Sequence, residues 1–380
     1  MSERYQDRLE SIRIWMSEKD VTTSVVFLPD HQFYLTNFKA LTYSRPIVLL
    51  IDKEKTALVV PGLEEVHANH VSTIDQVAVY YETDQHQNEA TSLYKRLREV
   101  LKDFDCNKVA IDEQNAPIMF LRHFVPVGSE TVDLSAKLVE MRYIKSTEEI
   151  DEIKKTGVWI NEAVNKSYEA CAIGVTELEV DGAGNTYLFE NLPTHFPDAT
   201  IAAHGMSPAG PVRSVMPHVF SSSKRIEEGD VLIHTRQLAI NGYRSELERT
   251  FIIGEPTSEQ ADAFNAMLDA QTAAIHLLKP GIKAYEVDQV ATSLLKERGY
   301  GEAIVHRTGH GIGISPHEEP YLRFDNDLVL QEGMVFTIEP GIYIKGLGGF
   351  RHSDTVVITK QGFDWVTDYP RDLESMTVKL

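Results

Sequence analysis

A phrase of eight residues occurs twice in the later part of the chain and restricts the fold more than any other feature. The phrase GVTELEVD at residues 174–181 returns as GIKAYEVD at residues 281–288. Each copy follows a long helical pattern, residues 147–172 and 258–278, and precedes a second helix and then strands. We therefore predict two halves related by a pseudo-two-fold axis, with a cleft where the halves meet.

The first part of the chain has the pattern of a separate α/β domain. Its β-rich runs are residues 24–28, 46–51, 56–60, 76–81 and 108–111, and helical patterns lie between some of them. Ser146 and Glu149 have the spacing of a capping box, which predicts the start of a long helix. A length of 380 residues suits two domains. We expect them to comprise residues 1–140 and 141–380.

Residues 305–354 are rich in histidines, acids and glycines, a combination that a hydrophobic core does not require. His306, His310 and His317 come first, and we expect His310 to reach the site from a loop. Glu339 and Arg351 follow. Glycines let the backbone turn tightly and approach a ligand, while imidazoles and carboxylates supply proton transfer or metal ligation. We interpret this stretch as the centre of a functional site rather than as a glycine-rich surface loop.

A β-hairpin is predicted between residues 229 and 251. The dipeptide Asn241-Gly242 separates two strand-like runs, which is a strong short-range hairpin signal. A two-residue turn would pair Thr235 with Glu248 and Gln237 with Glu246. Strand alternation then directs these side chains to one face, so two carboxylates would lie together there.

The stretches HRTGHGIG at residues 306–313 and HEEP at residues 317–320 resemble the M24 family of aminopeptidase P, prolidase and creatinase. This resemblance implies an α/β N-terminal domain followed by an α+β "pita-bread" domain with an internal pseudo-two-fold duplication. It also implies a homodimer, because family members direct N-terminal-domain residues toward the neighbouring subunit's site. The phrase Tyr43-Ser44-Arg45-Pro46 matches that region, so Arg45 is a candidate for this role.

The resemblance breaks at the metal ligands. The peptidases of the family hold two divalent metals with two Asp, one His and two Glu. The matching positions here are Thr235, Glu246, His310, Glu339 and Ser353. Two close dications need several shared carboxylates to offset their repulsion. We therefore expect no metal or, as the alternative, a single Mn, Co or Zn ion on Glu246, His310 and Glu339.

These departures resemble creatinase, a member that hydrolyses a C–N bond without metal and shares the sequence Leu-Glu-Arg-Thr found at residues 247–250. The resemblance implies His218 as the general base and a developing charge steadied by nearby histidines. The predicted catalytic residues are His218, His310, His317, Glu248 and Glu339. The predicted substrate contacts are Arg45, Arg213, His306, Glu246 and Arg351, with Arg45 or Arg213 meeting a substrate carboxylate.

Three functions fit these residues. The first is metal-independent hydrolysis of a C–N bond in a small amidino, amide or peptide-like substrate. The second is an Xaa-Pro dipeptidase or aminopeptidase with one weakly held metal, which the HEEP run favours. The third is a non-catalytic binder that kept the fold, although a binder has no need of so many proton-transfer groups. We expect a hydrolase that acts on a small molecule or dipeptide.

Composition excludes other classes of partner. A formal net charge of −20 disfavours nucleic acid and anionic membranes. The sequence has no apolar run that would span a bilayer, and its first residues lack the apolar core of a signal peptide. Its two cysteines, Cys106 and Cys171, fall in different predicted domains. We therefore expect a cytoplasmic protein.

Overall fold

The computed structural model describes residues 2–124 and 130–380. The chain divides into two compact units, Met1–Met141 and Arg142–Leu380. Each unit has its own sheet and its own apolar core. Among the described residues, no helix is long and apolar enough to cross a membrane.

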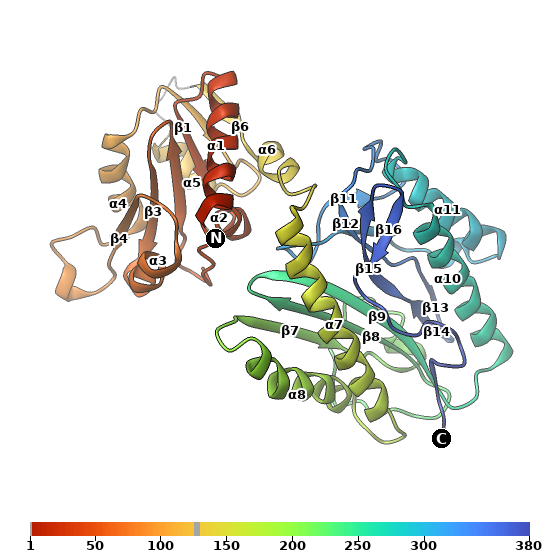
Figure 1. Ribbon diagram of the computed structural model, residues 1–380. Helices are drawn as coiled ribbons and strands as arrows, with labels where there is room; N and C mark the ends of the chain where they lie inside the picture. Colours follow the sequence, from red (N-terminus) through yellow and green to blue (C-terminus); the bar gives the residue numbers. More distant parts are fainter. Residues whose placement is uncertain (1, 125–129) are drawn as a thin grey trace. The chain divides into compact units, whose positions relative to one another are not determined.

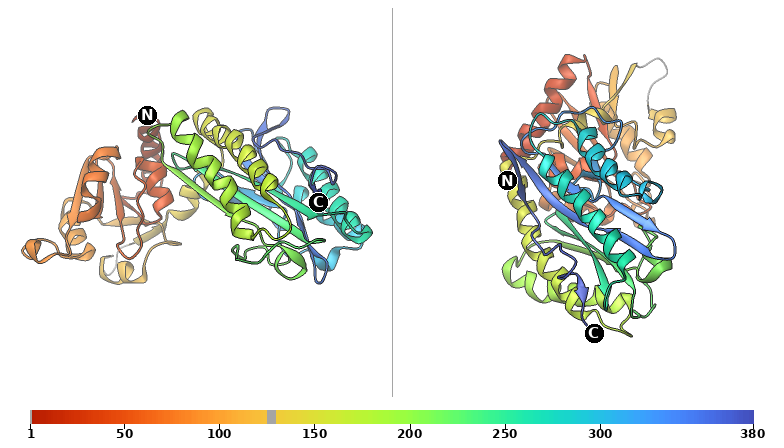
Figure 2. Two further views of the ribbon diagram at one scale, coloured as in Figure 1. Left: turned by 90° about the horizontal axis from the view of Figure 1, so that it is seen from below. Right: turned by 90° about the vertical axis from the view of Figure 1, so that its right-hand side faces the viewer.

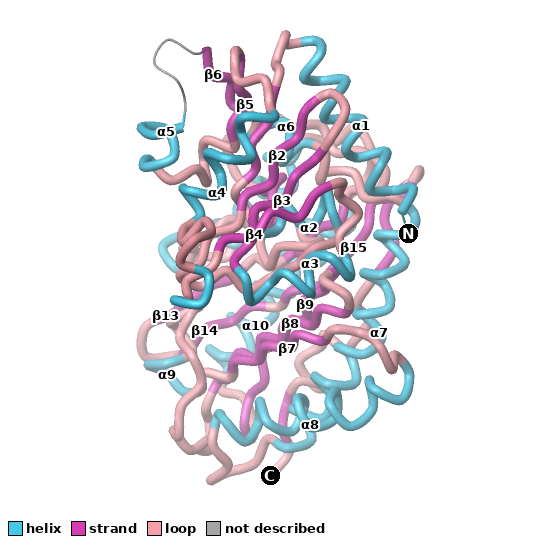
Figure 3. The backbone as a smooth tube through the Cα atoms, turned by 90° about the vertical axis from the view of Figure 1, so that its left-hand side faces the viewer, coloured by secondary structure: helices cyan, strands magenta, loops and turns pink. Residues whose placement is uncertain are grey.

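Unit 1 is an α/β structure around a mixed sheet. Among its described residues the strand order is β4-β3-β2-β1-β5-β6. The strands are β1 Thr23–Val26, β2 Val48–Asp52, β3 Thr56–Pro61, β4 Gln76–Tyr80, β5 Lys108–Ile111 and β6 Glu130–Asp133. The helices are α1 Ser2–Glu18, α2 Pro29–Thr36, α3 Glu65–Val71, α4 Leu93–Val100, α5 Ile118–Phe124 and α6 Ser135–Glu140. Figure 3 shows β2, β3 and β4 side by side, and α4 packs against β3 and β4.

Every residue of unit 2 is described, and its main sheet has the order β11-β10-β12-β15-β9-β8-β7, with β16 paired to β15 and β17 to β9. Its strands are β7 Ile201–Met206, β8 Val231–Ile240, β9 Tyr243–Ile253, β10 Gly309–Gly311, β11 Glu318–Leu322, β12 Val335–Ile338, β13 Gly341–Ile344, β14 Gly348–Arg351, β15 Ser353–Thr359, β16 Gly362–Trp365 and β17 Thr377–Val378. Its helices are α7 Thr147–Ala170, α8 Glu177–His195, α9 Gly210–Arg213, α10 Ser258–Leu277 and α11 Ala284–Glu297. Strands β13 and β14 form a separate hairpin.

The repeated phrase marks the same turn in both halves of unit 2. Gly174 and Gly281 have φ values of 86° and 93°, a left-handed conformation that glycine adopts without steric cost. Each glycine is followed by the second helix of a pair, α8 or α11, and the two pairs are visible in Figures 1 and 2. The predicted order of helix, turn, helix and strands is therefore confirmed. The capping box of Ser146 and Glu149 at the start of α7 is confirmed as well.

The hairpin of β8 and β9 has the predicted register. Thr235 pairs with Glu248 and Gln237 pairs with Glu246. Asn241 and Gly242 form the turn with φ values of 51° and 87°. A two-residue hairpin turn that matches the right-handed twist of its strands requires positive φ at both positions. Helix α7 packs against both strands.

Alternation along the hairpin separates two sets of side chains. Arg236 contacts α7 and α8, because its guanidinium donates hydrogen bonds to Ser167 Oγ and to the Asp181 carbonyl. His234 lies on the same face, and its Nδ1 is 3.9 Å from Asp181 Oδ1. The other face carries the carboxylates of Glu246 and Glu248, away from these helices.

Candidate active site

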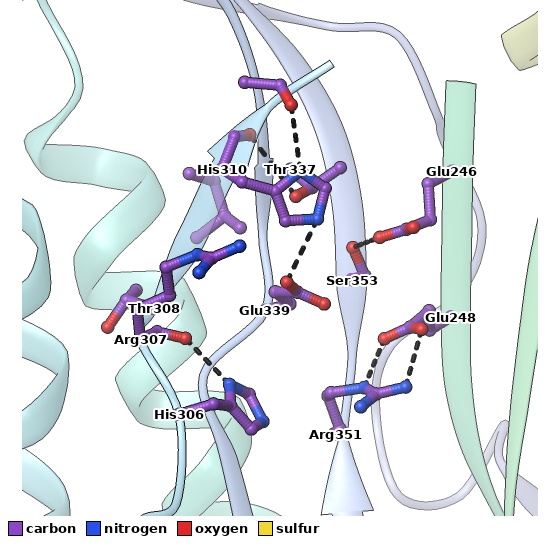
Figure 4. Close-up of polar contacts among 12 residues, drawn as sticks. Glu246, Glu248, His306, Arg307, Thr308, His310, Thr337, Glu339, Arg351 and Ser353 are labelled. Carbon is purple, nitrogen blue, oxygen red and sulfur yellow. Dashed lines mark hydrogen bonds and ion pairs between the residues drawn. The ribbon is translucent and has the colours of Figure 1, made fainter. Parts of the chain in front are cut away.

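Four neighbouring strands bring the acids and histidines of unit 2 together. Glu246 and Glu248 lie on β9, and the adjacent β15 begins with Ser353, which is paired with Glu248. His310 on β10 is paired with Thr337 of β12, and Glu339 directly follows that strand. Figure 4 shows the side chains of Glu246, His310 and Glu339 converging on one space. His310 was expected on a loop, and this expectation is wrong, because β10 forms a short strand between β11 and β12.

His310 is buried and oriented by its neighbours. Its Nδ1 lies 2.9 Å from the Gly311 carbonyl oxygen. Because a carbonyl oxygen can only accept, Nδ1 is protonated and donates a hydrogen bond to it. Its Nε2 faces Glu339 Oε1 at 3.2 Å. Burial alone would lower the pKa of His310, but Glu339 and Glu246 raise it to about 9. Burial likewise opposes ionisation of Glu339, and His310 nevertheless holds the Glu339 pKa well below its usual range.

Glu246 is held in place by neutral donors. The Ser353 hydroxyl donates to Glu246 Oε1 at 2.9 Å, and Gln237 Nε2 donates to Oε2 at 2.5 Å. Burial raises the pKa of Glu246, and the neighbouring Glu339 charge raises it further. Both of these hydrogen-bond donors are neutral, and the nearby charge of His310 acts on the pKa of Glu246 in the opposite direction to burial.

Glu248 is different, because a buried arginine holds both of its oxygens. Arg351 Nη2 donates to Glu248 Oε1 at 2.7 Å, and Arg351 Nε donates to Oε2. The Thr235 hydroxyl also donates to Oε1, at 2.8 Å. Burial raises the pKa of Glu248 to about 7, although Arg351 acts in the opposite direction.

The same arginine is linked to a tyrosine and a histidine that border the site. Arg351 Nη1 donates to the Tyr343 hydroxyl at 3.0 Å, and that hydroxyl lies 2.8 Å from His306 Nε2. Tyr343 was not among the predicted site residues. The glycine-rich run KGLGG at residues 345–349 is a turn signal, and alternation around that turn would have placed Tyr343 and Arg351 on one face.

His317 and His218 form the exposed side of the site. The rings of His310 and His317 stack at a centroid distance of 3.9 Å, and His218 lies 6.4 Å from His317. Burial lowers the pKa of His317 to about 4, and the neighbouring His310 lowers it as well. At pH 7 His317 is therefore neutral, and it lies beside the exposed His218.

Two predicted substrate contacts are engaged elsewhere. Arg213 donates from Nε and Nη2 to both oxygens of the buried Glu177, at 2.7 and 2.8 Å. A substrate carboxylate would have to compete with this bidentate pair. Arg45, in unit 1, forms an exposed ion pair with Glu82 at 2.6 Å.

The donor set fits one divalent cation better than two. Ligand atoms of Glu246, His310 and His317 lie within 4.8 Å of one another, and so do those of Glu246, Glu248 and Glu339. The first group offers an imidazole Nε2 directed at carboxylates by a hydrogen bond from Nδ1, as metal-binding histidines usually are. In the second group Arg351 already binds both oxygens of Glu248.

Comparison with known proteins identifies the class. Residues 151–360 match the model of metallopeptidase family M24, and residues 8–144 match the creatinase/prolidase N-terminal domain. The chain therefore belongs to the M24 metallopeptidase family. The predicted fold class, an α/β N-terminal domain followed by a pita-bread domain, is confirmed.

Several similar members are Xaa-Pro dipeptidases. The chain is 31% identical to an Xaa-Pro dipeptidase of Pyrococcus furiosus, over 97% of this chain and 99% of the relative. It is 30% identical to an Xaa-Pro dipeptidase of Lactobacillus helveticus, over 98% and 99% of the two chains. The crystal structure of a prolidase from Pyrococcus horikoshii has a TM-score of 0.84 and 30% identity, and the match covers 97% of this chain and 99% of that one.

Proposed function

We propose that this chain hydrolyses the peptide bond of Xaa-Pro dipeptides and holds one divalent cation on Glu246, His310 and Glu339. The sequence analysis placed metal-independent hydrolysis first, but the relatives at about 30% identity favour the peptidase that was its alternative. The observation that carries the proposal is the buried convergence of these three side chains, with His310 Nε2 directed at Glu339.

The chemistry that such a cation supplies when bound is polarisation of the scissile carbonyl and a lower pKa for bound water. The chain's own residues would perform the other tasks. His218, exposed beside the neutral His317, would move a proton toward the leaving imino nitrogen. The homodimer and the role of Arg45 toward a substrate carboxylate stay predictions.

A screen of substrates with and without metal tests the proposal. The chain, dialysed against EDTA, is assayed on Xaa-Pro dipeptides, on Ala-Ala as a control and on guanidino acids. We expect hydrolysis of Xaa-Pro only, restored by Mn²⁺, Co²⁺ or Zn²⁺. Glu246→Gln should prevent the restoration and lower the metal content, because it removes a charged ligand. Full activity after EDTA, with no metal in the protein, would refute the single-cation mechanism.

The metal-independent hydrolase remains a second candidate because of one observation. The acids already have internal partners, Arg351 for Glu248 and His310 for Glu339, so a cationic substrate group could take the place of a metal. Hydrolysis of a guanidino acid that survives EDTA would support this candidate. A chain that binds these ligands without turning them over would instead be a binder.

A further inference from the structure

A buried acid of α8 holds both ends of the segment that carries His218. Residues 209–222 comprise α9 and the turns that follow it, and His218 lies exposed within them. At the start of the segment the Ala209 amide donates to Glu177 Oε1 at 2.8 Å. At its end the Ser222 amide and hydroxyl donate to Glu177 Oε2 at 2.7 and 2.9 Å. One carboxylate therefore joins the two ends of the segment.

Arg213 extends this attachment to the close neighbours of His218. Its Nε and Nη2 donate to the two oxygens of Glu177, and Nη2 also donates to the Phe220 carbonyl at 2.7 Å. Phe220 is the second residue after His218. Because a bidentate pair fixes the plane of a guanidinium, Glu177 also determines the direction in which Arg213 can donate. The chain on both sides of His218 is thereby tied to one side chain.

The charge of Glu177 strengthens these contacts. Glu177 is fully buried, and burial alone would raise its pKa, but Arg213 and the amides of Ala209 and Ser222 hold the pKa below its usual value. The carboxylate accepts five hydrogen bonds from the segment. Hydrogen bonds to an ionised acceptor are roughly twice as strong as those between neutral groups. A neutral side chain at this position would hold the segment less firmly.

The second copy of the repeated phrase shows that the local fold does not need this acid. Glu177 is the first residue of α8, and the matching residue of the second copy, Ala284, is the first residue of α11. Both residues are buried, and both follow a glycine of left-handed conformation. The same turn and helix start thus form with alanine. The acid occurs in the half of unit 2 whose following segment carries His218.

We infer that Glu177 is a positioning residue that holds His218 at the rim of the site by fixing both ends of residues 209–222. The inference rests on the proton-transfer role proposed for His218. Ser214 and Ser221 also attach the segment, because their hydroxyls accept hydrogen bonds from backbone amides of unit 2. Loss of the charge of Glu177 should therefore displace the segment without unfolding the unit.

A double-mutant cycle measures whether Glu177 acts through His218. Glu177→Gln keeps the size of the side chain and removes the charge that holds Arg213 and the two ends of the segment. With Mn²⁺ present, kcat on an Xaa-Pro dipeptide should fall by about 10- to 10²-fold, because small displacements of a reacting group cost this much. KM should stay within about twofold. In the His218→Ala background the same substitution should change kcat by less than about twofold.

Glu149→Gln is the matched control. Glu149 is a buried acid in the first turn of α7 that accepts from the Tyr243 hydroxyl at 2.9 Å and from the Ser146 amide at 3.0 Å. This variant should keep the kcat of the wild type. Hydrogen exchange measured by mass spectrometry reports on the segment directly. Amides of residues 209–222 should exchange about tenfold faster in Glu177→Gln and at the wild-type rate in Glu149→Gln.

The outcomes distinguish this inference from the proposed function. Wild-type kcat or wild-type exchange of residues 209–222 in a folded Glu177→Gln would overturn the inference, and so would an equal loss in the His218→Ala background. A chain that hydrolyses no Xaa-Pro dipeptide would refute the proposed function, and the exchange rates would still decide whether Glu177 fixes the segment. Ser222→Ala, which removes the hydroxyl hydrogen bond and leaves the carboxylate, serves if Glu177→Gln does not fold. Its kcat should fall by about two- to tenfold, and only where His218 is present.

Discussion

Individual side chains define the site through contacts between distant parts of the sequence. Arg351 reaches Glu248 across 103 positions, and Arg213 is bound by Glu177 across 36. Residue types and strand alternation predicted which groups would gather in the site. They could not predict which arginine would be neutralised, because that depends on which carboxylate lies within reach after folding. Tyr343 is a different case, because the glycine-rich turn at residues 345–349 and strand alternation would have placed it on the face of Arg351.

In the proposed mechanism the proton is transferred by His218, an exposed histidine at the rim of the site. His218→Ala should lower kcat by about 10²- to 10⁴-fold, because general acid–base groups typically contribute that much. His204→Ala is the matched control, since His204 is also exposed and also lies near an aromatic ring, that of Phe220. Equal losses in the two variants would show that His218 is not the base.

At the scale of elements, the β8–β9 hairpin shows how much local sequence can decide. The Asn-Gly turn fixed the register, and the register fixed the face on which Glu246 and Glu248 lie. By contrast, β10 has only three residues, and the sequence suggested a loop there. Its strand conformation depends on pairing with both β11 and β12, which no local pattern reveals.

Two glycine-to-alanine substitutions with opposite expected effects on stability test the hairpin turn. Gly242→Ala places a Cβ at a φ of 87° and should lower the free energy of unfolding by about 1–2 kcal/mol. Gly182→Ala lies within α8, where an added Cβ meets nothing within 4 Å, and it should raise the free energy by about 0.8–1 kcal/mol. Urea unfolding measures both. Stabilisation by Gly242→Ala would contradict the assigned turn conformation.

At the scale of the whole molecule, each unit has a core of its own, and unit 2 also carries a buried ion network joining its first residues to β11. Glu318 is paired with Arg142 and with Lys145, the latter at 2.8 Å. Burial would raise the pKa of Glu318, but Lys145 and Arg142 lower it to about 2. The sequence signalled the helix start nearby, and nothing in it indicated this long-range partner.

This network predicts a defined acid sensitivity. Because the pKa of Glu318 is 4.5 unfolded and about 2 folded, its ionisation contributes about 3 kcal/mol to stability above pH 4.5. That contribution is lost as the pH falls from 4.5 toward 2. Glu318→Gln should therefore lower stability at pH 7 by about 3–5 kcal/mol, since it leaves two buried cations unpaired. Glu318→Gln should also make the free energy of unfolding less dependent on pH between 4.5 and 2.

Thermal unfolding of the metal-free protein between pH 3 and pH 7 measures this effect. Asp325→Asn is the matched control, because Asp325 and Arg323 form an ion pair with both side chains nearly half exposed. Exposed pairs of this kind contribute about 0–1 kcal/mol, so the control should retain the wild-type pH profile. Parallel profiles for Glu318→Gln and the wild type would argue against the assigned pairing.

The pairing of Thr235 with Glu248 across the hairpin has a wider consequence for how enzymes of this architecture diverge. Side chains of cross-strand partners lie about 4.5–5.5 Å apart at Cβ, so an acid on either strand enters nearly the same volume. A negative group can therefore migrate from one strand to its neighbour without any shift of the backbone. In this hairpin the neutral hydroxyl of Thr235 lies on one strand and the carboxylate of Glu248 on the other, and both enter that shared volume.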